Sequence, residues 1–384
     1  MNTKLLGSSL IISGTALGAG MLAIPMVLAQ FGLWYGTLLM IFICFGTTYA
    51  ALLLLEATIK SGGGLGLNSI ARKTLGKGGQ LVSNALLYAL LICLLMAYIL
   101  GAADLVNQLA LKFGVDLTNH QSQIGFTLLS GMVIATGTGV IDKLNRALFF
   151  VMIASLSATL LFLLPEFSSN NLIRVINDDH FALIKTSAVL FTSFGFMVVI
   201  PSLVSYNKEA TDKQLRNMVI VGSLIPLVCY LCWLFAVVGN LKPEQLGELK
   251  GISDLIAAFE HHSSWFASLL SVFTGLALLT SFFGVAMSLY NQNRDMFNQN
   301  RVVTYVITFI LPLVGAMFAA DKFLSVLAYA GIILVVLAIF VPLAMVYKLR
   351  LAGTEEERYT TEGGTTMLLF SLLFGGFLLA SQVI

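Results

Sequence analysis

The sequence SGTALGAGMLAIP at residues 13–25 interrupts the first long apolar stretch of the chain. Its three glycines, Gly14, Gly18 and Gly20, destabilise a continuous helix, because glycine loses more backbone freedom on folding than any other residue. One interpretation is close helix packing, since Gly14 and Gly18 form a G-x-x-x-G pattern. The other is a helix that is broken within the membrane.

A second interruption has the same form. The sequence TSFGF at residues 192–196 places polar and glycine residues inside an apolar stretch, and Pro201 follows. Corresponding interruptions in two halves of a membrane protein are typical of inverted-repeat transporters, whose broken helices meet at a binding site near the midplane. The pair therefore favours two broken helices over packing alone.

Composition supports a membrane protein. Of the 384 residues, 58% are hydrophobic and 10% are charged, and the mean hydropathy is +0.92. Soluble domains carry roughly 25% charged residues, so this chain has too few polar side chains to cover a water-exposed surface. Apolar stretches of about 20 residues, the length that crosses a bilayer, recur along the chain.

These stretches predict an all-α integral membrane protein with eleven transmembrane helices. We expect a first inverted repeat at residues 6–164, a second at 184–347, and an extra C-terminal helix at 365–383. The expected spans are residues 6–31, 34–56, 80–109, 122–140, 146–164, 184–205, 217–240, 264–291, 302–319, 323–347 and 365–383.

The loops between these spans predict an orientation. With an odd number of spans the loops fall into two sets, and fifteen of the 21 lysines and arginines lie in the set that includes the N-terminus. Cytoplasmic loops carry an excess of lysine and arginine. We therefore expect a cytoplasmic N-terminus and a C-terminus on the other side.

The first interruption predicts how a substrate is held. Amides of Gly18, Ala19 and Gly20, at the start of a second half-helix, suit a carboxylate, because they lack intrahelical acceptors and carry positive partial charge. Carbonyls near the end of the first half-helix suit an ammonium group; these belong to Gly14, Thr15 and Ala16. A zwitterionic amino acid presents both groups.

The second interruption carries three phenylalanines, Phe191, Phe194 and Phe196. Aromatic side chains near a binding site suit an aromatic substrate, because rings gain from edge-to-face packing. The alternative is that these rings face lipid, since the chain has 27 phenylalanines. The sequence leaves both interpretations open.

Several strings together resemble the bacterial aromatic amino acid permeases, most closely the tyrosine-specific branch. They are GTALGAGMLAIP at 14–25, ALLLLE at 51–56, AYILGAAD at 97–104, FTSFGF at 191–196, PSLVSY at 201–206, TSFFGVA at 280–286 and LAYAG at 327–331. The resemblance covers nearly the whole chain. It implies a LeuT-type fold of two inverted repeats of five helices, with helices 1 and 6 broken and an eleventh helix added. It also implies proton-driven uptake across the bacterial inner membrane.

The resemblance also implies roles for particular residues. Thr192, Ser193, Phe194 and Phe196 would lie at the substrate, and Tyr98 would reach its carboxylate. Separately from the resemblance, Tyr329 or the hydroxyls of Thr280 and Ser281 could supply a hydrogen-bond partner for the phenol of a tyrosine substrate, and the sequence leaves open which.

The sequence leaves open which ion is coupled to transport. Thr280 and Ser281 match residues that bind sodium in sodium-coupled relatives, so the pair leaves protons and sodium open. Relatives usually have a histidine directly after the FTSFGF string, whereas this chain has Met197. That departure puts selectivity and proton coupling in doubt.

Two carboxylates are candidates for ion coupling, because ionisable residues within membranes are usually functional. Glu56 lies four residues before Lys60, and the alternative for it is an ion pair at the cytoplasmic end of its helix. Asp104 lies toward the outer end of the third span, where hydration or pairing is the alternative.

Other functional classes are less compatible with the sequence. A sodium-coupled or broader-specificity amino acid transporter stays open, as does a non-transporting amino acid sensor on the same fold. We expect no catalytic residues, metal site or cofactor, because no H-E-x-x-H or comparable motif occurs. No basic patch indicates nucleic acid.

Overall fold

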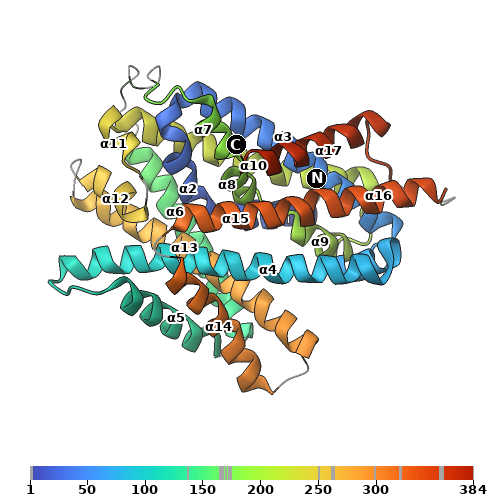
Figure 1. Ribbon diagram of the computed structural model, residues 1–384, viewed down its shortest axis with the longest axis horizontal. Coiled ribbons are helices and arrows are strands. Elements are labelled where there is room, and N and C mark those ends of the chain that lie inside the picture. Colours follow the sequence, from blue (N-terminus) through green and yellow to red (C-terminus); the bar gives the residue numbers. More distant parts are fainter. Residues whose placement is uncertain are drawn as a thin grey trace.

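The computed structural model describes residues 3–135, 138–163, 168, 171, 175–249, 251–260, 264–297, 300–319, 322–353 and 359–383. Within these ranges the chain forms helices, turns and irregular segments, and no strand (Figure 1). The regular α-helices are α1 (Thr3–Ala16), α2 (Ala19–Leu28), α3 (Gly32–Lys60), α4 (Leu67–Lys112), α5 (Asn119–Ala135), α6 (Thr138–Leu163), α7 (His180–Lys185), α8 (Ser187–Ser193), α9 (Ile200–Tyr206), α10 (Asp212–Asn240), α11 (Pro243–Gly247), α12 (Ile252–Glu260), α13 (Ser264–Phe297), α14 (Arg301–Phe318), α15 (Phe323–Val335), α16 (Val341–Leu351) and α17 (Gly364–Ala380). Shorter segments are the 3-10 turns η1 (Ala29–Phe31) and η3 (Met197–Val199) and the π-helical segment η4 (Val336–Phe340), which joins α15 to α16.

The first apolar stretch is broken where the glycines predict. Helix α1 ends at Ala16 and α2 begins at Ala19, so Leu17 and Gly18 lie between the two half-helices. Pro25 lies inside α2. The interruption is therefore a true break in the helix.

The sixth stretch is broken in the same way. Helix α8 ends at Ser193, the turn η3 follows at Met197, and α9 starts at Ile200. Pro201 lies in the first turn of α9, where a missing N–H costs little because that N–H has no intrahelical acceptor. Both predicted interruptions are thus present.

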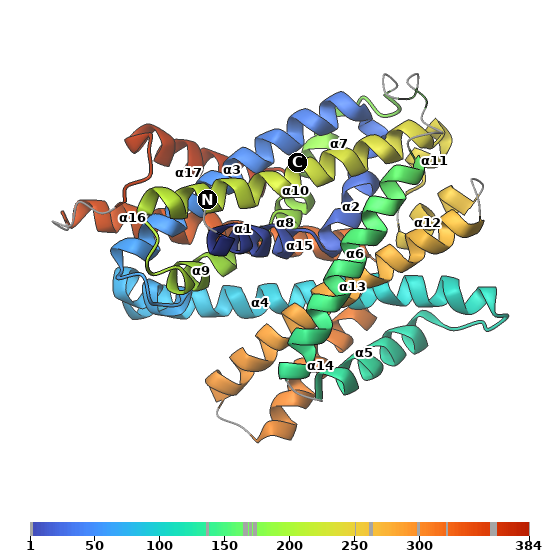
Figure 2. The ribbon, with the colours of Figure 1, turned by 180° about the vertical axis from the view of Figure 1, so that it is seen from behind.

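The two broken helices lie side by side in the middle of the molecule. Helix α2 packs on α8, α1 on α10, and α15 on both α8 and α4. Figure 2 shows α1, α2 and α8 at the centre, with α4, α13 and α6 on one side and α3 and α10 on the other. The short helices α11 and α12 lie at one end of the long helices, and the end of α16 lies at the other.

Within the described part of the chain, seven helices are long and apolar enough to cross a membrane, by length and composition alone. Two shorter apolar helices span Val302–Phe318 and Gly364–Ala380. Helical residues occupy all eleven expected ranges. The exact number of crossings stays a prediction.

Two regions differ from the expected spans. Helix α4 begins at Leu67 instead of residue 80, and its first turns are set at an angle by Gly76, which has a φ of 81°. Glycine adopts this conformation without the steric penalty that other residues meet. The segment between α10 and α13, expected as a plain loop, forms the short helices α11 and α12.

Candidate functional site

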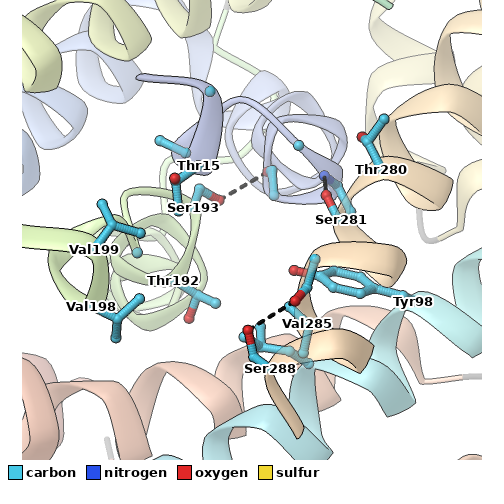
Figure 3. A pocket seen from close by; sticks show the side chains of 18 of the residues that line it. Thr15, Tyr98, Thr192, Ser193, Val198, Val199, Thr280, Ser281, Val285 and Ser288 are labelled. Atoms are coloured by element: carbon cyan, nitrogen blue, oxygen red, sulfur yellow. Dashed lines mark hydrogen bonds between the residues drawn. The ribbon is translucent and has the colours of Figure 1, made fainter. Parts of the chain in front are cut away.

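A cavity of about 700 Å³ lies where the two broken helices meet. Figure 3 shows Thr192, Ser193 and Val199 on one side of it, and Ser281 and Tyr98 on the other. The cavity is lined by Leu10, Ile11, Gly14, Thr15, Ala16, Gly18, Ala19, Gly20, Leu87, Leu90, Leu91, Leu94, Tyr98, Asn145, Arg146, Phe149, Phe150, Thr192, Ser193, Gly195, Val198, Val199, Thr280, Ser281, Gly284, Val285, Ser288, Leu327 and Leu334.

The first break lines the cavity with backbone. All six residues predicted there reach the cavity wall, namely Gly14, Thr15, Ala16, Gly18, Ala19 and Gly20. The amide of Gly18 donates to the carbonyl of Ala16 at 2.8 Å. The amide of Ala19 donates to Ser281 Oγ at 3.1 Å, so α13 provides an acceptor at the start of α2.

The glycines of the first break also allow close packing against neighbouring helices. A Cβ at Gly18 would collide with Ser281 Oγ, and one at Gly20 would lie 2.8 Å from Ser193 Cα. The missing side chains of Gly18 and Gly20 therefore allow the first break to contact α13 and α8.

The second break lines the cavity with Thr192, Ser193 and Gly195. Ser193 Oγ donates to the carbonyls of Gly20 at 2.9 Å and Val189 at 3.0 Å, which it can serve only in turn. Ser193 therefore joins the second break to the first.

Three further predicted residues reach the cavity. Tyr98 on α4 is buried and lies on the same side of the cavity as Ser281 (Figure 3). Thr280 Oγ1 lies 2.9 Å from the carbonyl of Leu276, one turn earlier on α13. The cavity therefore brings Tyr98, Thr280 and Ser281 together with the two breaks.

The phenylalanines of the second break do not line the cavity, which corrects the expected aromatic pocket. Phe191, Phe194 and Phe196 are fully buried. Phe194 packs edge-on against Tyr230, with ring centroids 5.0 Å apart, and Phe191 packs against Phe374 at 6.1 Å. Their backbone turns these rings into the core behind the site.

Tyr329 also lies away from the cavity, contrary to the expectation that it bonds a substrate phenol. Its exposed fraction is 61%, and the cavity residues of the same helix are Leu327 and Leu334. Two residues along an α-helix are about 200° apart around its axis. Tyr329 therefore points away from the wall that Leu327 forms.

Helix α6 contributes residues that the sequence did not indicate. Asn145, Arg146, Phe149 and Phe150 all line the cavity. Asn145 Oδ1 is buried and has no hydrogen-bond partner among the residues that the structure describes. Asn145 and Arg146 stand at the boundary between an expected loop and the expected span 146–164, so no signal marked them.

The two candidate carboxylates lie outside the cavity lining. Glu56 is fully buried and accepts hydrogen bonds from Lys60 Nζ at 3.0 Å, Arg350 Nη2 at 2.7 Å and the Thr361 amide at 2.8 Å. The ion pair with Lys60 therefore forms, and Arg350 extends it. Asp104 accepts from the Ser253 amide at 2.8 Å, at the start of α12.

Comparison with known proteins connects this geometry to a family. The model of the tryptophan/tyrosine permease family matches residues 1–382. Glutamine transporter 2 of Aliivibrio fischeri is 60% identical, with 100% of both chains covered. Tyrosine-specific transport system 1 of Haemophilus influenzae is 34% identical, covering 97% of this chain and 94% of the relative.

A solved structure shares the fold. The chain is similar to the inward-facing conformation of Mhp1, with a TM-score of 0.70 and 13% sequence identity, covering 99% of this chain and 88% of that one. Mhp1 is a transporter of the LeuT fold. The expected fold class is confirmed.

Proposed function

The chain belongs to the tryptophan/tyrosine permease family, and on that premise we propose that it imports a neutral amino acid, with glutamine the first candidate substrate and tyrosine the second. The family and its structural neighbours are membrane transporters and not enzymes. The proposed uptake proceeds by alternating access across the bacterial inner membrane, with the N-terminus cytoplasmic and the C-terminus periplasmic.

The observation that carries the proposal is the meeting of both helix breaks at one cavity. The N-terminal end of α2, at Ala19 and Gly20, offers positive partial charge to a carboxylate. The C-terminal ends of α1 and α8 offer carbonyl oxygens to an ammonium group. An amino acid head fits both ends, which supports the substrate class whatever its side chain.

Glutamine is the first candidate because of the 60% identical relative and the character of the wall. Aliphatic side chains such as Leu90, Val199 and Leu334 alternate with hydroxyls such as Ser288. The rings of Phe194 and Phe196 are turned away from it. Met197, at the position where the resemblance led us to expect a histidine, is fully buried.

Tyrosine stays a candidate on separate grounds. Two tyrosine-specific relatives are 34% and 31% identical over nearly the whole chain. Phe149 and Phe150 of α6 line the cavity and offer aromatic surface from the opposite side. A tyrosine ring would pack against these residues instead of against the second break.

Proton coupling is proposed over sodium coupling. Ser281 Oγ already accepts the Ala19 amide, and Thr280 Oγ1 already bonds a carbonyl of its own helix. Both hydroxyls keep lone pairs that could still bind a cation, so the proposal of protons rests on the resemblance to proton-driven permeases and not on these contacts. Asp104 remains a proposed carrier of the proton, acting from outside the cavity, whereas the pairing of Glu56 with Lys60 and Arg350 disfavours its protonation.

Uptake into proteoliposomes tests the proposal. Labelled glutamine, tyrosine, tryptophan and leucine are supplied separately, under an imposed proton gradient or an imposed sodium gradient. We expect glutamine to accumulate most under the proton gradient. Accumulation of tyrosine alone would reverse the order of candidates, and uptake of none of these amino acids would contradict the proposed function.

A further inference from the structure

Tyr230 connects the two helix breaks from behind the cavity. It lies on α10, is fully buried, and does not line the cavity. Its hydroxyl oxygen lies 2.7 Å from the carbonyl oxygen of Ala16 and 2.7 Å from that of Ser193. These are the last residues of α1 and α8, so one side chain reaches the end of both first half-helices.

The two carbonyls compete for one hydrogen. Carbonyls at the C-terminal end of a helix lack the usual intrahelical donor and carry negative partial charge. The Ala16 carbonyl also accepts the Gly18 amide at 2.8 Å, so Tyr230 is a second donor to it, whereas the Ser193 carbonyl is reached by the Tyr230 hydroxyl. A phenol has a single O–H hydrogen, so Tyr230 can donate to Ala16 or to Ser193, but not to both at once.

We propose that Tyr230 is a positioning residue that fixes the two breaks to each other and shares its hydrogen between them. When the ammonium group of a substrate bonds one carbonyl, the Tyr230 hydrogen serves the other. The empty site is thereby held in a shape that accepts an amino acid. The substrate part of this inference rests on the proposed function, whereas the link between the breaks does not.

Neighbouring contacts hold Tyr230 and both breaks in this arrangement. The ring of Phe194 packs on the ring of Tyr230 at an interplanar angle of 73°. Ser193 Oγ lies 2.9 Å from the carbonyl of Gly20, on the far side of the first break. The second break is thus linked to both half-helices of the first. It reaches α2 directly through Ser193 Oγ and α1 through the hydroxyl of Tyr230.

Tyr230→Phe tests the proposal, because it removes the hydroxyl and keeps the ring. The matched control is Tyr49→Phe, which also removes a hydroxyl that bonds a carbonyl, that of Glu362 at 3.0 Å. Tyr49 does not line the cavity. Both variants are purified and compared with wild type by amide hydrogen exchange without substrate, and by equilibrium binding of glutamine and of tyrosine.

We expect Tyr230→Phe to accelerate exchange at residues 16–20 and 193–197 together. We also expect it to weaken binding of the preferred amino acid about tenfold, because two carbonyls lose their shared donor. Tyr49→Phe should change neither. If Tyr230→Phe does not fold, Phe194→Leu, which keeps the hydroxyl and loosens its ring, should give the same paired acceleration at a smaller size.

Exchange that changes in only one break, or in neither, would overturn the proposed link. Equal weakening of binding by Tyr49→Phe would show a general loss of stability and would also overturn it. Failure of wild type to bind any amino acid would instead contradict the proposed function, and the exchange result would still decide whether Tyr230 joins the breaks.

Discussion

The two helix breaks line the same cavity, but they do so with different chemical groups. At the first, Gly14, Gly18 and Gly20 leave the backbone itself as the cavity wall. At the second, Ser193 and Gly195 face the cavity while Phe194 and Phe196 fill the core behind it. The first break is therefore held largely by Tyr230, Ser193 and Ser281 from other helices, whereas the second is packed by its own rings.

This difference predicts that the first break is the more sensitive to added bulk. Gly20→Leu should weaken amino acid binding about 100-fold or more, because displacing groups in a site by about 1 Å has effects of that size. A Cβ at Gly20 would lie 2.8 Å from the backbone of Ser193, which cannot move freely. Isothermal titration of folded protein with glutamine and tyrosine measures the effect.

The control for Gly20→Leu is Gly284→Ala. Gly284 also lines the cavity, and its Cβ would meet no atom within 4 Å. Binding close to that of wild type is expected. Equal losses in both variants would mean that any change in the cavity wall disrupts binding, and the first break would have no special role.

A substitution at the second break should have the opposite effect, namely a loss of stability without a change of substrate selectivity. Phe194→Ala should lower the free energy of unfolding by about 3–5 kcal/mol, as large-to-small changes of buried aromatics do. The ratio of glutamine to tyrosine affinity should stay the same, because the ring does not reach the cavity. Thermal unfolding in detergent and competition binding give the two values.

Phe150→Ala is the counterpart of that variant on α6. Phe150 lines the cavity with 73% of its surface exposed, so its loss should change stability little and should alter the affinity ratio. If Phe194→Ala changed the ratio and Phe150→Ala did not, the aromatic pocket would belong to the second break after all.

The smallest effect is expected at Tyr329. Its side chain is largely exposed on the side of α15 away from the cavity. Tyr329→Phe should leave stability within about 0.5 kcal/mol of wild type and leave tyrosine binding unchanged. Selective loss of tyrosine binding would instead support the original prediction that Tyr329 hydrogen-bonds with the phenol of the substrate.

The sequence predicted both breaks because glycine and proline act on the backbone locally. It also predicted the ion pair of Glu56 with Lys60, since residues four apart lie on the same side of a helix. Side-chain direction next to a break was not predictable, because the helical periodicity that assigns faces ends there. The directions of Phe194 and Phe196 were wrong for this reason.

Tyr230 was missed for a different reason. A tyrosine within an apolar stretch has no local partner in the sequence. The carbonyls that its hydroxyl contacts belong to Ala16 and Ser193, which lie on helices distant in the sequence. The cavity residues Asn145 and Phe149 were likewise hidden, because the approach of α6 to α1 depends on tertiary packing. Local sequence patterns therefore located the backbone of the site. The side chains that line the cavity could be identified only from the folded structure.

A structure of the protein with its bound amino acid tests the central claim most directly. The account predicts the substrate carboxylate at the start of α2, beside Ala19 and Gly20, and its ammonium group at the carbonyl ends of α1 and α8, near Ala16 and Ser193. Density for the amino acid head against Asn145 and Arg146 instead, with both breaks unoccupied, would contradict it.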